Sequence, residues 1–365
     1  MKIATIIGAR PQFIKAAVVS KKLREKNHEI IIHTGQHYDK NMSECFFEEL
    51  NIPKPDFSLG IGSASHSKQT AEMMTKIEEI LLKEMPDMVL VYGDTNSTLA
   101  GALTAAKLYV PVIHIEAGLR SFDRRMPEEI NRVLTDHMSE LLFCPTDTAV
   151  ENLKNEGIRK GVYQVGDVMC DAVRYYSDTM ESGRQNEYIS QLVPLYGEKN
   201  RKMDKWYLAT FHRAENTDKI EKIQIVLNSL EELPYPVIFP VHPRINKYVC
   251  ELLKISKYNN IFFVEPTGYK NLLYLAKYAV KVITDSGGLQ KESYILNTPC
   301  VILREQTEWV ETLNGNCNIL TKIEKQDILY KILQINPDNS KRVPYYGNGD
   351  AAVKICDIIH QLDRK

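Results

Sequence analysis

Residues 282–292 read VITDSGGLQKE, in which an apolar strand runs into a turn of small residues that begins a helix. Gly287 and Gly288 have no Cβ to block the approach of an anion, and Ser286 offers a hydroxyl. The first N–H groups of a helix point outward and attract negative charge. Glu292 follows about one turn into the helix, where a carboxylate can bind the paired hydroxyls of a ribose. The stretch therefore predicts a nucleotide phosphate site, with an ordinary strand–turn–helix junction as the alternative.

Short apolar runs of the same kind alternate with helical patterns along the chain, which is typical of parallel sheets with crossover helices. The strands expected in the first half are residues 2–7, 29–34, 88–92, 112–115, 141–144 and 162–165. Those expected in the second half are residues 206–210, 236–239, 261–264, 280–284, 300–303 and 318–320. The predicted fold class is α/β, with two Rossmann-like, doubly wound parallel sheets. Such an arrangement places its ligand between the halves, beyond the carboxyl ends of the strands.

The two series of strands predict two domains in the 365 residues. We place the first domain at residues 1–174 and the second at residues 206–349. The segment 175–205 is polar and contains no strong strand, so we expect the connection there. Apolar residues recur at helical spacing over 350–362, which indicates a closing amphipathic helix.

The charge balance argues against nucleic acid and membrane surfaces as partners. Lys and Arg number 46 against 47 Asp and Glu, which leaves a net charge of −1 and favours a small-molecule partner. The seven cysteines form no C-x-x-C pair and are typical of buried thiols in a reducing cytoplasm. No segment has the length of a membrane span, and the run 3–7 is too short for a signal peptide. We therefore expect a cytoplasmic protein.

Charged residues follow the expected strands of the first half. Arg10 lies in GARPQFIK (8–15) and offers a planar fork to phosphate or carboxylate, unless this is merely a surface loop. Asp94 lies in GDTNS (93–97), where helix capping is the alternative for the cluster. Glu116 ends an otherwise apolar strand, which is a costly place for a carboxylate without a function. Glu128 and Glu129 begin a helix, whose dipole alone would account for one of them.

Two histidines follow strands of the second half, and each stands near an arginine. They are His212 in TFHRAEN (210–216) and His242 in PVHPR (240–244). A single histidine is more often structural, but two in the same topological position favour a functional site. A metal site is disfavoured because H-x-x-x-H and C-x-x-C spacings are absent. A nicotinamide cofactor is disfavoured because the glycine pair at 60 and 62 lacks the third glycine of the dinucleotide motif.

Taken in chain order, these motifs resemble those of the non-hydrolysing UDP-N-acetylglucosamine 2-epimerases. They are GARP at 8–11, GDT at 93–95, HIEAGLR at 114–120, PEE at 127–129, HR at 212–213, HP at 242–243 and TDSGG at 284–288. The likeness extends to YGNG at 346–349, so it covers nearly the whole chain. It implies a GT-B fold with an interdomain cleft, a homodimer, and UDP-sugar binding without metal or nicotinamide. It also implies that the last helix, 350–365, packs back on the first domain.

The resemblance also implies roles for individual residues. The implied catalytic residues are Asp94, Glu116, Glu128 and His212. The residues implied to bind UDP or substrate are Arg10, Lys15, His242, Thr267, Gly268, Tyr269, Ser286, Gly287, Gly288, Glu292 and Arg213. In bacterial members a further UDP-GlcNAc molecule acts as an activator near the active site, and the comparable segments here contain Gln36, His37, Gln69 and Arg213.

The chemistry implied by the family follows from one difficulty, since no carbonyl acidifies the hydrogen on C2 of the sugar. Breaking the anomeric C1–O bond first, with UDP leaving, develops oxocarbenium character that makes the C2 proton removable by a carboxylate. The product is a glycal, and re-addition of UDP after protonation from the opposite face gives the other epimer. A hydrolysing relative that releases N-acetylmannosamine and UDP, a GT-B glycosyltransferase and a silent UDP-sugar binding protein remain alternatives.

One departure from the family pattern concerns the substrate. UDP-GlcNAc enzymes usually read TERPE where this chain reads TEWVE at 307–311. This makes the chain similar to the branch acting on UDP-2,3-diacetamido-2,3-dideoxy-glucuronate in surface-polysaccharide synthesis, although Trp309 could simply fill the core. An arginine could pair with the carboxylate of that uronate. The candidates are Arg120, Arg124, Arg125 and Arg213.

Overall fold

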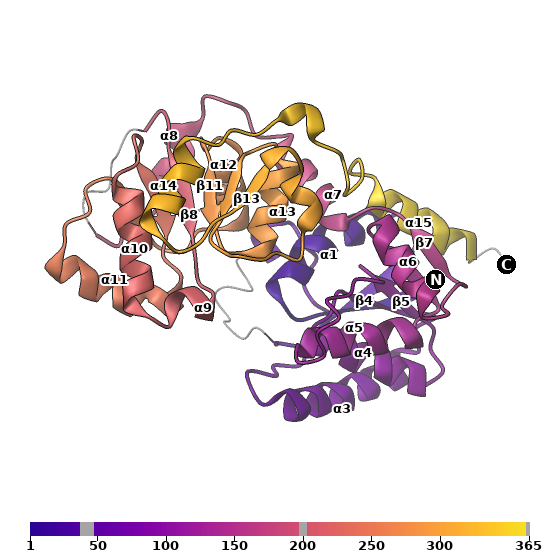
Figure 1. Cartoon of the computed structure of the whole chain (residues 1–365). Coiled ribbons are helices and arrows are strands. Elements are labelled where there is room, and N and C mark those ends of the chain that lie inside the picture. The colour runs from indigo at the N-terminus through magenta and orange to yellow at the C-terminus, as the bar shows by residue number, and fades with distance from the viewer. Residues whose placement is uncertain (37–46, 197–202, 363–365) are drawn as a thin grey trace. The chain divides into compact units, whose positions relative to one another are not determined.

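The computed structural model describes residues 1–36, 47–196 and 203–362. The chain divides into two compact units, residues 1–175 with 345–365 and residues 176–344. Each unit contains one parallel β-sheet with helices packed on it (Figure 1). The predicted fold class is confirmed.

The sheet of the first unit has the strand order β3-β2-β1-β4-β5-β6-β7, with every neighbouring pair parallel. Its strands are β1 (Lys2–Ile7), β2 (His28–His33), β3 (Phe57–Ser58), β4 (Met88–Tyr92), β5 (Val112–Ile115), β6 (Leu141–Cys144) and β7 (Val162–Gln164). The central strands β4 and β5 are buried along their whole length. Apolar side chains on both faces of these strands explain why they read as continuous hydrophobic runs.

Right-handed crossovers place helices on both faces of this sheet. The helices are α1 (Arg10–Leu23), α3 (His66–Glu84), α4 (Asn96–Lys107), α5 (Pro127–Met138), α6 (Asp147–Asn155), α7 (Val168–Ser177) and α15 (Ala351–Leu362). Helix α4 packs between α3 and α5, and α1 packs against α15 (Figure 1). Gly101 allows α4 to approach the sheet closely, because a Cβ there would lie 2.6 Å from Ile6 Cδ1.

The end of the chain returns to the first unit. Asp171 accepts hydrogen bonds from the backbone N–H groups of Ala351, at 3.1 Å, and Ala352, at 2.7 Å. These bonds satisfy two of the unpaired donors at the start of α15. Ile355 and Ile359 are buried on the face of α15 that lies in the unit. The last helix is therefore part of the fold that begins at the N-terminus.

The sheet of the second unit has the order β10-β9-β8-β11-β12-β13, again parallel throughout. Its strands are β8 (Tyr207–Thr210), β9 (Val237–Pro240), β10 (Ile261–Val264), β11 (Val282–Thr284), β12 (Cys300–Ile302) and β13 (Asn318–Leu320). Its helices are α8 (Gln185–Ser190), α9 (Ala214–Thr217), α10 (Ile220–Glu231), α11 (Pro243–Ile255), α12 (Tyr269–Lys277), α13 (Gly287–Ile295) and α14 (Lys325–Leu333), with 3-10 helices at Val310–Asn316 and Asn339–Lys341. Stacked Phe211 and Phe239, whose ring centroids are 5.1 Å apart, lie in its core.

All the strands expected from the sequence are present, with ends that differ by no more than two residues. The short strand β3 was not predicted, because two residues give no apolar run to recognise. Helix α8 lies inside the segment expected as a connection, and residues 176–196 belong to the second unit. Glu265 and Leu195 join this segment to the second sheet through backbone hydrogen bonds.

Both sheets reverse their strand order beside the first strand of the unit. In the first unit β1 lies between β2 and β4, and in the second β8 lies between β9 and β11. Ligands of open α/β sheets bind at such switch points, beyond the carboxyl ends of the strands. The loops that matter are therefore those after β1 and β4 and those after β8 and β11.

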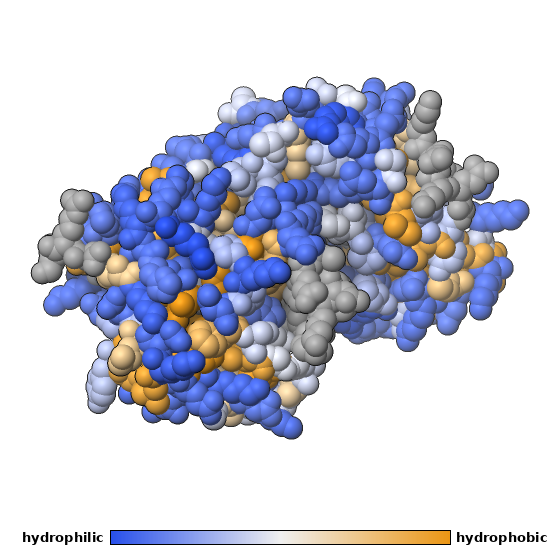
Figure 2. Space-filling model, turned by 180° about the vertical axis from the view of Figure 1, so that it is seen from behind, coloured by the Kyte–Doolittle hydropathy of each residue, from blue (hydrophilic) through white to orange (hydrophobic). Residues whose placement is uncertain are grey.

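The face of the molecule seen in Figure 2 is mainly hydrophilic, with hydrophobic groups gathered in limited patches. No helix within the described ranges combines the length and the apolar character needed to cross a bilayer.

Candidate functional site

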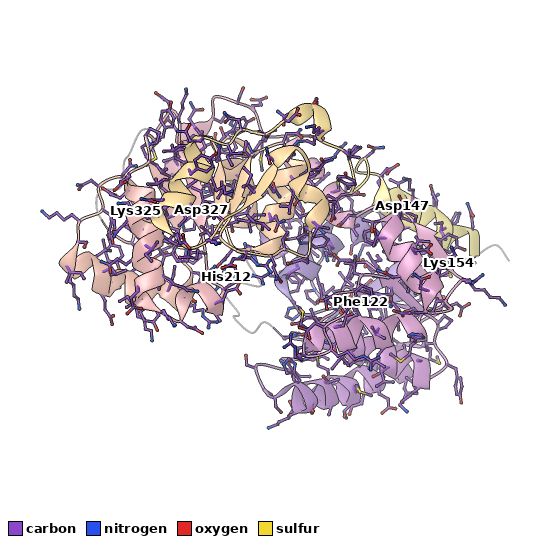
Figure 3. All side chains as sticks on the ribbon, in the orientation of Figure 1. Phe122, Asp147, Lys154, His212, Lys325 and Asp327 are labelled. Carbon is purple, nitrogen blue, oxygen red and sulfur yellow. The ribbon has the colours of Figure 1, made fainter. Side chains whose placement is uncertain are left out.

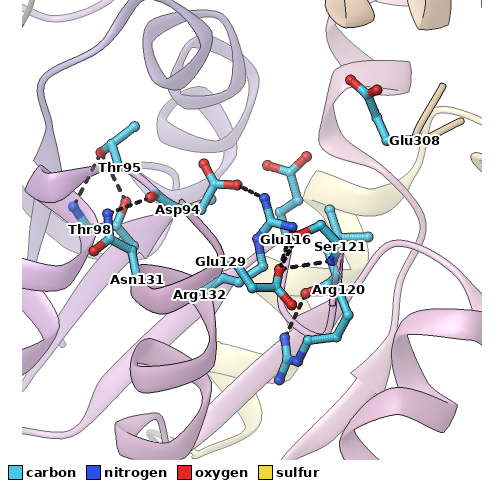
Figure 4. A network of polar contacts seen from close by, with 12 residues as sticks. Asp94, Thr95, Thr98, Glu116, Arg120, Ser121, Glu129, Asn131, Arg132 and Glu308 are labelled. Atoms are coloured by element: carbon cyan, nitrogen blue, oxygen red, sulfur yellow. Dashed lines mark hydrogen bonds and ion pairs between the residues drawn. The ribbon is translucent and has the colours of Figure 1, made fainter. Parts of the chain in front are cut away.

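Asp94 lies in the loop between β4 and α4. Its neighbour Thr95 is the N-cap of α4 and accepts from the backbone N–H of Thr98 at 3.4 Å. Asp94 instead pairs through Oδ2 with the guanidinium of Arg132 on α5 (Figure 4). The carbonyl of Asp94 accepts from Nδ2 of Asn131 at 2.9 Å. Capping therefore accounts for Thr95 and leaves Asp94 as a carboxylate held by a cation.

Glu116 follows β5 with a φ of +74°, in the left-handed region. Such a backbone costs about 1 kcal/mol or more for a residue other than glycine, and it is concentrated at functional sites. The carboxylate forms an ion pair with Lys15 of α1, and the two side chains are 10% and 8% exposed. A strained, nearly buried ion pair at the end of a strand supports a functional role for both residues.

The two ion pairs belong to one cluster at the carboxyl edge of the first sheet. A Cβ on Gly93, which precedes Asp94, would lie 3.2 Å from Glu116 Oε2 and 3.8 Å from Lys15 Nζ. Gln12 of α1 joins the same loops, because its Nε2 donates to the carbonyl of Tyr92 at 2.9 Å while its Oε1 accepts from Gly8 N at 2.8 Å. The residues after β1, β4 and β5 are thus fixed relative to one another.

Adjacent carboxylates of α5 differ in their surroundings. Glu129 is buried and accepts from the backbone N–H groups of Ser121, at 2.8 Å, and Phe122, at 2.9 Å, and from Arg132 at 3.0 Å (Figure 4). Burial opposes ionisation of Glu129, but these donors outweigh it and hold its pKa below the usual value. Glu128 is exposed and makes no hydrogen bond or ion pair with the residues that the structure describes. Glu129 therefore holds the loop, and Glu128 is the one that solvent reaches.

Two glutamines lie beside this cluster at the start of α4. Gln36 Oε1 accepts from Ser97 N at 3.0 Å, and Gln69 Oε1 accepts from Asn96 Nδ2 at 2.8 Å. His37, which the sequence places in the same segment, lies outside the described residues. Arg10 is the first residue of α1 and is half-buried.

Asp285 organises the corresponding loops of the second unit. It is fully buried and accepts from His212 N at 3.0 Å, Arg213 N at 2.9 Å and Asn216 Nδ2 at 3.0 Å. Arg213 Nε also donates to the carbonyl of Asp285 at 2.9 Å. One carboxylate therefore ties the loop after β8 to the loop after β11.

His212 and His242 are stacked, with ring centroids 4.8 Å apart and planes 22° from parallel. Nδ1 of His212 lies 3.6 Å from Asp285, and its side chain is 39% exposed (Figure 3). Nδ1 of His242 accepts from Arg244 N at 3.2 Å and so caps α11. The prediction that these two histidines share a position at the edge of the sheet agrees with this contact.

The turn predicted to bind phosphate begins α13. Ser286 is its N-cap and accepts from Leu289 N at 3.4 Å. A Cβ on Gly287 would collide with Glu308 Oε1, whereas the nearest atom to a Cβ on Gly288 is Ser286 Oγ at 3.8 Å. Glu308 in turn pairs with Arg213 at 3.4 Å. A carboxylate already lies against the start of this helix, which is where an anion is favoured.

Other residues implied to bind substrate lie on α12 and α13. Gly268 is the exposed N-cap of α12, and Thr267, which precedes it, is half-buried. The side chain of Tyr269 is buried and packs edge-on against Tyr176, so only its backbone could contact a ligand. Glu292 is buried on α13.

Trp309 does not simply fill the core. It is half-buried, its indole lies beside Gly287, and Lys291 Nζ lies 4.2 Å above its ring.

Among residues 1–36, 47–196 and 203–362, no group of three or more His, Cys, Asp or Glu side chains is arranged to hold a metal ion.

Comparison with known proteins agrees with the resemblance. Residues 21–360 match the family model described as UDP-N-acetylglucosamine 2-epimerase. The chain belongs to this epimerase family. A UDP-N-acetylglucosamine 2-epimerase homolog of Methanococcus maripaludis is 52% identical over 365 residues, covering 99% of this chain and 100% of the relative. The UDP-2,3-diacetamido-2,3-dideoxy-D-glucuronate 2-epimerase of Pseudomonas aeruginosa is 45% identical over 372 residues, with 99% and 100% covered, so the branch named from the TEWVE motif is represented.

Solved structures of the family share the fold. The UDP-GlcNAc 2-epimerase of Methanocaldococcus jannaschii, in complex with UDP-GlcNAc and UDP, matches with a TM-score of 0.83 and 40% identity over 99% of this chain and 100% of that chain. The enzyme of Neisseria meningitidis bound to UDP-GlcNAc matches with a TM-score of 0.84 and 29% identity, with the same coverage. This epimerase therefore has the GT-B-like architecture of its family.

Sequence reasoning missed several residues that shape the epimerase site. Arg132, Glu129 and Asp285 received no role, although Glu129 and Arg132 stand at i and i+3 on α5, a spacing that favours ion pairs. Arg120 was considered for binding a substrate carboxylate. Its guanidinium is instead buried between Asp136, at 2.7 Å, and Glu156, at 2.6 Å, so it is committed to the fold.

Proposed function

We propose that this enzyme inverts C2 of a UDP-N-acetylglucosamine-type sugar by eliminating UDP and adding it back, without hydrolysis. The observation that carries the proposal is the pair of carboxylates Asp94 and Glu116, each joined to a cation at adjacent strand ends. Inversion through a glycal needs acid and base groups for two faces of the sugar, and one cluster with several carboxylates supplies them. The relatives named as UDP-N-acetylglucosamine 2-epimerases support the same reaction.

We assign the removal and return of the C2 proton to the carboxylate cluster. A base must be ionised, and the paired Lys15 and Arg132 supply the opposite charge that lets a carboxylate remain ionised where it is partly buried. Glu128, exposed at the start of α5, is the proposed third carboxylate. His212 is the proposed fourth participant.

We assign the nucleotide to the second unit and to Arg10. The start of α13 attracts negative charge, and Arg213 already pairs with an anion, Glu308. Such groups stabilise the diphosphate as its charge develops on leaving C1. The residues proposed to bind UDP or substrate are Arg10, Lys15, His242, Thr267, Gly268, Tyr269, Ser286, Gly287, Gly288, Glu292 and Arg213.

We propose the diacetamido uronate as the preferred sugar. Overall identity does not separate the substrates, because the Pseudomonas aeruginosa uronate enzyme and the Methanococcus maripaludis UDP-GlcNAc enzyme are 45% and 46% identical to this chain. The distinguishing feature is Trp309, which lies beside Gly287. With Arg120 buried in two ion pairs, Arg124, Arg125 and Arg213 remain the candidates to pair with the carboxylate of the uronate. We further propose a homodimer that serves surface-polysaccharide synthesis.

An NMR time course in heavy water tests the reaction. We expect each UDP-sugar to be converted into its C2 epimer, with deuterium at C2 of both and no free sugar. Release of N-acetylmannosamine would establish the hydrolysing reaction instead, and absence of solvent label would exclude elimination. Parallel assays with the diacetamido uronate and UDP-GlcNAc test the substrate: a higher specificity constant for UDP-GlcNAc would refute the uronate and leave the epimerase reaction standing.

A further inference from the structure

A buried histidine connects the two loops that carry Asp94 and Glu116. His114 lies on β5, two residues before Glu116, and is fully buried. Its Nε2 lies 2.8 Å from the carbonyl oxygen of Gly93, and its Nδ1 lies 2.7 Å from Oδ1 of Asp136 on α5. One imidazole therefore contacts the loop after β4 and the helix that follows the loop after β5.

These two contacts fix the orientation of the ring. A carbonyl oxygen only accepts hydrogen bonds, so Nε2 of His114 is the donor to Gly93. Nδ1 faces the carboxylate of Asp136, so both ring nitrogens are engaged and the imidazole cannot turn without losing a buried hydrogen bond.

Asp136 is itself held by further donors. Its second oxygen, Oδ2, accepts from Gly118 N at 3.1 Å and from Arg120 at 2.7 Å. Burial opposes ionisation, but the contacts with His114 and Arg120 outweigh it and hold the pKa of Asp136 below its usual value. Arg120 also pairs with Glu156 at 2.6 Å. A buried hydrogen-bonded network of this kind is rigid.

The bond to Gly93 acts on the carboxylate cluster. Gly93 has a φ of +62°, and the plane of its peptide sets the direction in which Asp94 leaves the strand. The same glycine lies against Glu116, because a Cβ added to Gly93 would be 3.2 Å from Glu116 Oε2. We propose that His114 is a positioning residue whose Nε2 donor fixes the Gly93–Asp94 peptide and thereby the spacing of Asp94 and Glu116. This proposal rests on the proposed epimerase reaction.

Two substitutions separate positioning from simple support of the fold. The amide nitrogen of Gln reaches about as far as Nε2 of histidine, so His114→Gln keeps a donor for Gly93 and loses the bond to Asp136. The shorter Asn reaches about as far as Nδ1, so His114→Asn keeps a donor for Asp136 and leaves the Gly93 carbonyl without one. Each variant gives up one buried hydrogen bond, and both should lose similar thermal stability.

The experiment measures kcat, KM and thermal unfolding of both variants, with His137→Gln as the matched control. His137 is a half-exposed histidine 3.4 Å from Glu156, at the edge of the same cluster. We expect His114→Asn to lower kcat by about 100-fold with little change in KM, because small displacements of catalytic groups have effects of this size. We expect His114→Gln to retain kcat within about threefold and the control to match the wild type.

Equal losses of kcat in the two His114 variants would overturn the proposal. It would also be overturned if the loss of kcat tracked the loss of thermal stability, whichever hydrogen-bond donor the variant keeps. A second measurement needs no variant to fold. Nitrogen-15 NMR of the wild-type protein should show Nε2 of His114 protonated, and a ring with its proton on Nδ1 alone would refute the bond to Gly93. An inactive wild-type enzyme would instead refute the proposed function, so the two failures are distinguishable.

Discussion

Each unit has a buried aspartate that joins neighbouring segments, and the two differ in their donors. Asp136 in the first unit lies on α5 and is bound by the side chains of His114 and Arg120 and by the backbone N–H of Gly118. Asp285 in the second unit is bound by backbone N–H groups and the amide of Asn216. Asp136 joins α5 to β5 and the loop after it, whereas Asp285 joins the loops after β8 and β11.

The contrast bears on the two kinds of site that we propose. In the first unit Lys15 pairs with Glu116 and Arg132 pairs with Asp94, so cations hold the proposed acid and base groups. In the second unit Asp285 is satisfied mainly by uncharged donors, and Arg213 pairs with Glu308 beside the turn proposed to bind phosphate. The proposed proton-transfer site and the proposed anion site therefore rest on aspartates with different kinds of donor.

The sharpest test of the comparison removes the acid and base groups themselves. We expect Asp94→Asn and Glu116→Gln to lower kcat by about 10² to 10⁴, the range for general acid–base groups. UDP affinity, measured by calorimetry, should stay within a few-fold, because the turn proposed to bind phosphate lies in the second unit and both changes keep Arg10 and Lys15. Asp123→Asn is the control, since Asp123 pairs with the exposed Arg125. Near-normal turnover in either variant would return that residue to a structural role.

The next test compares the two buried aspartates. Asp136→Asn removes one of the two carboxylates that enclose the buried Arg120 guanidinium and should destabilise the first unit by about 3–5 kcal/mol. Asp285→Asn keeps an oxygen for some of its donors and should cost the second unit about 1–3 kcal/mol. Both tryptophans, Trp206 and Trp309, belong to the second unit, so tryptophan fluorescence reports it selectively. We expect Asp285→Asn to shift the fluorescence transition and Asp136→Asn to shift mainly the circular dichroism transition. The reverse assignment would contradict the comparison.

Acid should distinguish the units as well. The folded-state pKa of Asp136 is lowered by His114 and Arg120 despite its burial. Its contribution to stability is therefore present above the unfolded value of about 3.9 and is lost as pH falls through the lower folded value. Urea midpoints measured between about pH 3 and pH 6 should fall with pH in the wild type and less steeply in Asp136→Asn. An unchanged slope in that variant would mean that other carboxylates, such as Glu129, dominate acid unfolding.

The smallest expected effect concerns the anion site. A methyl group at Gly287 would collide with Glu308, so Gly287→Ala must displace that carboxylate or move the turn. We expect UDP affinity to fall by about tenfold, which corresponds to about 1.4 kcal/mol, while the first unit keeps its stability. Glu251→Ala, at an exposed position of α11 in the same unit, is the control and should leave UDP affinity unchanged. An unchanged UDP affinity in Gly287→Ala would place the anion elsewhere.

The strands could be predicted from sequence because apolar β-rich runs are local signals, and only β3, with two residues, fell below recognition. The positions of Asp94, Glu116 and Ser286 at strand ends followed from the same runs. Their partners did not, because the pairing of Asp94 with Arg132 depends on how α5 packs beside α4. Arg120 was a candidate for the substrate for the same reason: nothing near it in sequence shows that Asp136 and Glu156 enclose its guanidinium.

The return of α15 to α1 has a consequence for synthesis on the ribosome. The first 175 residues emerge before the second unit, yet they lack the helix whose Ile355 and Ile359 are buried in their fold. Residues 176–344 are continuous and can fold as soon as they leave the exit tunnel. The first unit is thus translated first, but its fold is completed last, when the backbone N–H groups of Ala351 and Ala352 bind the carboxylate of Asp171.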